Sequence, residues 1–137
     1  MATSKNFNWE IRVKIKKYFL IFASVSVSII AFLYGFFPYW FSQTFLNSPP
    51  LPLDFAHILR ALMGLYLGTT LFWLFSAFSD KYRNTAVLTT IIFSGGLLTG
   101  RILSLIMDGK PSVILLVYTI LELTLVPIAI WVFRLPD

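Results

Sequence analysis

Three ionisable side chains, Arg60, Arg101 and Glu122, lie inside stretches that are otherwise apolar enough to cross a membrane. A charge in hydrocarbon is costly, so such residues are rare, are usually paired and often mark a ligand or ion site. Arginine can bind a carboxylate or a phosphate through several N–H groups at once. These residues therefore indicate one of two arrangements. One is an ion pair that locks helices together, and the other is a site for an anion or a polar headgroup.

Helical spacing places further polar side chains beside these charges. Ser104 and Asp108 share a helical face with Arg101, and Tyr118 precedes Glu122 by four residues, which is about one turn. With both chain ends on the cytoplasmic side, all of these positions fall in the outer half of the membrane. The predicted polar cluster consists of Arg60, Arg101, Ser104, Asp108, Tyr118 and Glu122.

Small residues recur at helical spacing in three of the apolar stretches. Each arginine lies beside a Gly-x-x-x-Gly pair, and such pairs allow membrane helices to approach one another closely. We therefore predict helix packing at Gly64, Gly68, Gly96 and Gly100. The first apolar stretch has a similar seam of small residues, made of Ser24, Ser28 and Gly35.

No residue pattern indicates a metal site or a familiar catalytic mechanism. The chain has no cysteine, so disulfides and thiolate chemistry are excluded. Asp54, His57 and Asp108 match no established spacing of metal ligands, and serine-nucleophile and phosphate-loop motifs are absent. We predict no metal, no catalytic residue and no cofactor. A bound lipid or quinone is compatible with this interpretation.

The elements that must position these side chains are membrane-spanning helices. The sequence is 58% hydrophobic and 12% charged over 137 residues, whereas soluble domains carry about 25% charged residues. Four apolar runs each approach the ~20 residues needed to span a bilayer; they cover residues 18–37, 58–78, 86–107 and 112–133. We predict an all-α integral membrane four-helix bundle, with up-down-up-down order, over residues 18–137. Residues 1–17 form a basic N-terminal segment before it.

Basic residues are distributed unequally between the predicted connections. They gather before the first run, between the second and third, and after the fourth, at Lys5, Arg12, Lys14, Lys16, Lys17, Lys81, Arg83 and Arg134. The opposite side carries only Lys110 outside the spans. By the positive-inside rule, both termini are expected to be cytoplasmic. Since the net charge of +5 flanks membrane spans, we expect lipid headgroups, not nucleic acid, as its partner.

Residues 7–16 alternate between apolar and polar side chains, with a period of two that is typical of a strand. Three structures fit this segment: a strand that pairs with a partner protein, a stretch on the membrane surface, or a helical extension of the first span. We favour the last two, because an isolated strand has nothing in this chain to pair with.

These motifs resemble a family of small four-span bacterial membrane proteins known only as a domain of unknown function. The resemblance is carried by Arg60 to Gly68, by Gly100-Arg101-x-x-Ser104, by Asp108-Gly109-x-Pro111 and by Glu122. The layout is more loosely similar to the DoxX-like group, some of which are linked to quinone-dependent oxidoreductases. The resemblance implies a four-helix fold in the bacterial inner membrane and draws attention to the same charged residues. It implies no activity.

Three functions follow as hypotheses. The first is a non-catalytic accessory or structural subunit of a larger membrane complex, as the aromatic content of 18% and the small-residue seams favour. The second is the binding or transport of a lipid-like or quinone-like molecule by the Arg/Glu cluster. The third is a membrane enzyme with Glu122 as acid or base. We rank them in that order, so a non-catalytic role is expected.

Overall fold

The computed structural model describes the backbone of residues 2–46 and 49–136, and the side chains from residue 7 onward within those ranges. Four long helices are present, α1 (Ala2–Phe36), α3 (Leu53–Ala77), α4 (Arg83–Asp108) and α5 (Val113–Arg134), together with a short α2 (Pro38–Phe45). All four long helices are long and apolar enough to cross a membrane. The predicted all-α, four-helix membrane fold is confirmed.

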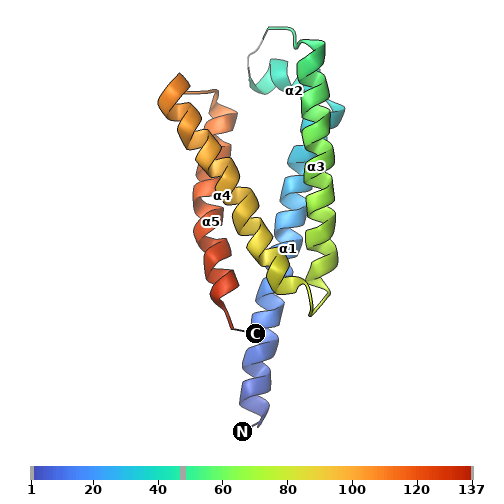
Figure 1. Cartoon of the computed structure of the whole chain (residues 1–137), viewed down its shortest axis with the longest axis vertical. Coiled ribbons are helices and arrows are strands. Elements are labelled where there is room, and N and C mark those ends of the chain that lie inside the picture. Colours follow the sequence, from blue (N-terminus) through green and yellow to red (C-terminus); the bar gives the residue numbers. More distant parts are fainter. Residues whose placement is uncertain (1, 47–48, 137) are drawn as a thin grey trace.

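The long helices form two pairs (Figure 1). α1 packs most extensively on α3, and α4 packs on α5, while fewer contacts join one pair to the other. α4 lies close to α1 near the end of the bundle that carries the chain termini, and it leans away from α3 toward the opposite end. The two pairs therefore meet at one end and diverge at the other.

Helix ends follow local sequence signals. α4 ends at Asp108 because Gly109 has a φ of 85°, in the left-handed region that glycine adopts without strain. The connection between the first two spans contains α2, a helix that was not predicted. It begins at Pro38, where the missing N–H of proline costs nothing because the first turn leaves such groups unpaired.

The N-terminal segment is helical. α1 runs without interruption through residue 17, and its first turns extend beyond the other helices (Figure 1). The strand alternative for residues 7–16 is therefore wrong, and the helical extension is confirmed. A helix satisfies its backbone hydrogen bonds within the segment, whereas a single strand would leave them open.

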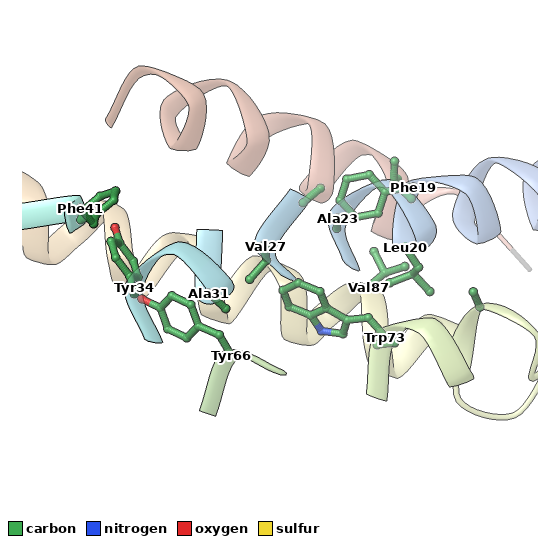
Figure 2. Close-up of a cluster of buried hydrophobic side chains, with 14 residues drawn as sticks. Phe19, Leu20, Ala23, Val27, Ala31, Tyr34, Phe41, Tyr66, Trp73 and Val87 are labelled. Carbon is green, nitrogen blue, oxygen red and sulfur yellow. The ribbon is translucent and has the colours of Figure 1, made fainter. Parts of the chain in front are cut away.

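The buried core is centred on α1. Leu20, Ala23, Val27, Ala31 and Tyr34 recur every three or four residues and are all nearly inaccessible to solvent. Figure 2 shows this face of α1 against side chains of the neighbouring helices, including Tyr66, Trp73, Val87 and Phe41. In the most apolar window of α1, 39% is buried, against 11% in α4 and in α5. The second pair thus leaves most of its apolar surface to the membrane.

The predicted small-residue seam of α1 is confirmed. Ser24 Oγ donates to the Leu20 carbonyl (2.8 Å) and to the Thr70 carbonyl (3.2 Å), and Ser28 Oγ donates to Thr70 Oγ1 (3.1 Å). At Gly35 an added Cβ would lie 2.6 Å from the Cβ of Met63, so only glycine fits there. These contacts hold α1 and α3 together at short range.

The four glycines that were predicted to pack helices have no close neighbours. An added Cβ on Gly64, Gly68, Gly96 or Gly100 would meet no neighbouring atom within 4 Å. The structure therefore does not place them in helix contacts within the chain. α3 packs on α1 through a different face, and α4 leans away from α3.

Candidate functional site

A charged pair joins α4 to α5. Arg101 Nε donates to both carboxylate oxygens of Glu122, at 3.0 Å to Oε1 and 2.9 Å to Oε2. The two side chains are 23% and 12% exposed. Each charge offsets the other, and this lowers the free-energy cost of holding both inside a membrane.

The antiparallel course of α4 and α5 brings these residues to similar depths. Arg101 lies seven residues before the end of α4 at Asp108, or about 10 Å along the axis. Glu122 lies nine residues after the start of α5, or about 14 Å. The pair is therefore well inside the span, on the side of the bundle opposite the chain termini.

Tyrosine side chains surround the guanidinium group. The Tyr118 ring centroid lies 5.7 Å from Arg101 Cζ, within the range of a cation–π interaction. Tyr34 of α1 lines the same hollow as Arg101 and lies close enough to interact with its guanidinium electrostatically. Sequence reasoning missed Tyr34, because no spacing along the chain links it to a residue in α4.

An apolar hollow of about 340 Å³ lies between α1, α4 and α5. Its charged and phenolic groups at one end include Tyr34, Arg101, Tyr118 and Glu122, from the parts of the helices farther from the chain termini, while the hydroxyls of Ser26, Ser94 and Thr124 are spread along the walls. Its apolar lining continues along α1 and α5 toward the termini, through Phe22, Val27, Leu125 and Ile128. We name this space the apolar hollow. It has a polar end and an apolar body.

A second hollow, of about 790 Å³, lies between α3 and α4. Gly96, Gly100, Ser104 and Asp108 line it from α4 at four-residue intervals, and Lys110 lines it from the following turn. We name it the outer hollow. Both hollows are lined by four common residues, Tyr66, Phe93, Leu97 and Arg101, so the guanidinium lies where they meet.

The predicted cluster divides in the structure. Arg101, Tyr118 and Glu122 come together, and Ser104 and Asp108 line the outer hollow beside Arg101. Arg60 lies apart: its Nε donates to the Gly35 carbonyl at 3.3 Å, near the end of α1, and it lines neither hollow. Carbonyls in the last turn of a helix lack intrahelical partners. Arg60 therefore supplies a donor to the end of α1 and links α1 to α3. The sequence prediction did not foresee that α3 turns Arg60 toward α1 and away from Arg101.

Across residues 7–46 and 49–136, no three histidine, aspartate or glutamate side chains gather as a metal site would need. Asp54 and Asp108 lie in different helices, at the start of α3 and the end of α4.

The family comparison covers most of the chain. The model of DUF4345, a domain of unknown function, matches residues 15–133. The chain belongs to this family. The match includes α3, α4, nearly all of α5 and residues 15–36 of α1, and it leaves out the earlier part of α1, where most of the period-two pattern lies. No curated protein and no solved structure matches the chain.

Proposed function

We propose that this DUF4345 protein binds a lipid-like or quinone-like molecule within the membrane. The polar end of the molecule would accept hydrogen bonds from Arg101, and its chain would occupy the apolar hollow. The support comes from one observation: a neutralised arginine with donors to spare lies at the junction of two hollows inside the span.

The donor inventory of Arg101 supports this role. A guanidinium has five N–H groups, and the hydrogen bonds to Glu122 come from Nε alone. Tyr34 can take one of the remaining groups. The terminal nitrogens therefore keep donors for a ligand oxygen, such as a carbonyl, an ester or a phosphate.

The surroundings of the pair favour a ligand site over an ion lock. A lock between helices would be enclosed by packed side chains. Here Arg101 lines both the apolar hollow and the outer hollow. The apolar hollow is within the ~300–1,000 Å³ range of ligand pockets, and such pockets combine apolar walls with a few polar groups.

Glu122 fits a positioning role better than a catalytic one. Both of its carboxylate oxygens accept hydrogen bonds from Arg101. An acid or base needs an oxygen that reaches the substrate. The carboxylate instead fixes the orientation of the arginine.

A role as an accessory subunit, which the sequence favours, is the second candidate. Gly64 and Gly68 lie on an exposed face of α3, with free space above each Cα. A helix of another protein could approach closely there. Isolation from native membranes in a mild detergent tests this function: a stable complex with other subunits supports it, and migration as the free chain contradicts it.

The ligand-binding proposal is tested with delipidated protein in dodecyl maltoside and two probes. These are cis-parinaric acid, a fluorescent fatty acid, and a short-chain ubiquinone that quenches tryptophan emission. The test variant is Arg101→Gln combined with Glu122→Gln, which removes the pair without leaving an uncompensated charge. Arg60→Gln is the matched control, since it removes an arginine that lines neither hollow.

We expect the double variant to lose binding of at least one probe by about tenfold or more, and the control to bind as the wild type does. Equal binding by all three proteins, with reduced thermal stability of the double variant, would show that the pair is only structural. The probe that responds distinguishes a fatty-acyl ligand from a quinone.

A further inference from the structure

We infer that the outer hollow holds the headgroup of a zwitterionic phospholipid, one that carries a phosphodiester and an ammonium group. Its ester end would lie at Arg101 and an acyl chain in the apolar hollow. This inference rests on the proposed function and names the ligand class.

The outer hollow has room for a headgroup. Gly96, Gly100, Ser104 and Asp108 are all exposed, and they extend over about 18 Å of α4 at 1.5 Å per residue. A Cβ added to Gly96 or Gly100 would have no neighbouring atom within 4 Å. A path with small side chains thus leads from the level of Arg101 to the end of the helix.

The charges along this path are balanced. Asp108 and Lys110 both line the outer hollow, and neither forms an ion pair with another residue in the described part of the chain. Arg101 is already neutralised by Glu122. The mouth therefore offers one negative and one positive group with no net charge. An ammonium group can lie at Asp108 and a phosphodiester at Lys110, whereas a net-anionic headgroup would bring like charge to Asp108.

The order of polarity matches that of a lipid in one leaflet. Charged groups lie at the end of α4 and Ser104 comes next. Arg101 lies about 10 Å from that helix end along the axis. The apolar hollow follows, lined by Phe22, Leu121 and Ile128. A phospholipid presents its headgroup, its esters and its chains in this sequence. A quinone or a fatty acid would leave Asp108 and Lys110 without a function.

The apolar hollow has a route to the bilayer. Phe22 and Ile128 line it and are also exposed on the surface of the bundle. α1 and α5, which carry these residues, make few contacts with each other. A phospholipid can therefore pass between α1 and α5 with its second chain remaining in the membrane.

Binding of fluorescent phosphatidylethanolamine, phosphatidylcholine and phosphatidylglycerol to the delipidated full chain tests the inference. We expect the wild type to prefer the zwitterionic lipids by about tenfold. Asp108→Asn is expected to abolish this preference by improving the binding of phosphatidylglycerol. Lys110→Gln is expected to weaken the binding of all three lipids. Lys14→Gln, a change outside both hollows, is the control and should bind as the wild type does.

Two results would overturn the inference: equal or better binding of phosphatidylglycerol by the wild type, or unchanged selectivity in Asp108→Asn. If selectivity is absent but the Arg101→Gln, Glu122→Gln variant loses all lipids, the proposed function stands and the headgroup assignment fails. If that variant keeps all lipids, both fail. Gly100→Leu gives a further check. Its Cβ would meet no atom within 4 Å and its side chain would extend into the outer hollow, so it should reduce the binding of phospholipids more than that of cis-parinaric acid.

Discussion

The guanidinium of Arg101 and the carboxylate of Glu122 depend on each other for their place in the membrane. Either charge alone would face apolar walls with few partners, and an unpaired ion there is expensive. Together they form a neutral, oriented group that still presents N–H donors. The pair thus holds hydrogen-bond donors in a fixed orientation beside an apolar space.

This dependence predicts non-additive effects on stability. Arg101→Gln or Glu122→Gln alone should lower the free energy of unfolding by about 1–3 kcal/mol, since each leaves an uncompensated charge. The double substitution should cost less than the sum of the two. Reversible unfolding in mixed micelles measures all three variants. Additive losses would contradict a direct interaction between the two side chains.

Among the helices, α1 and α3 form the most closely packed pair. Gly35 against Met63, and Ser24 and Ser28 against Thr70, bring these helices into close contact. Arg60 adds a hydrogen bond from α3 to the end of α1. The α4–α5 pair is attached to it mainly near the end that carries the termini.

We predict that Gly35→Ala destabilises the protein by about 1–3 kcal/mol, because the new Cβ would overlap the Met63 side chain. Combining it with Met63→Ala should restore part of the loss. Gly68→Ala is the matched control. Its Cβ enters free space, and alanine favours a helix by up to about 1 kcal/mol. Thermal unfolding in detergent measures these variants, and equal losses at Gly35 and Gly68 would contradict the packing described here.

The sequence was sufficient for the four spans, but it predicted neither α2 nor the directions in which the helices face. Apolar runs located the four spans because burial in lipid needs about 20 such residues. Asp108-Gly109 marked the end of α4 because glycine alone adopts its φ without strain. The contacts of Gly64 and Gly100 could not be inferred, since a Gly-x-x-x-Gly pair can line a hollow as readily as a helix contact. Arg60 and Tyr34 show the same limit: their partners depend on how each helix is rotated within the bundle.

At the scale of the whole molecule, both termini lie at the same end of the bundle, with α2 and the α4–α5 turn at the other (Figure 1). From the distribution of basic residues we predict that the termini lie in the cytoplasm. Because the chain has no cysteine, a thiol reagent that labels a single-cysteine variant reports the accessibility of that one position.

We therefore predict that Lys110→Cys reacts with a membrane-impermeant maleimide in intact cells. Lys14→Cys and Lys81→Cys should react only after the membrane is permeabilised. Labelling of all three positions in intact cells would contradict a single inserted orientation. Labelling of Lys14→Cys without Lys110→Cys would show that the orientation is the opposite of the predicted one.

Native mass spectrometry of protein released from its membrane shows whether the space around Arg101 binds a lipid. We predict a bound lipid on the wild type and on Gly64→Leu, whose new side chain enters free space outside both hollows. Gly100→Leu, which fills the outer hollow, should carry several-fold less lipid at unchanged thermal stability. Equal lipid on all three proteins, or none on the wild type, would contradict the binding of a lipid in this space.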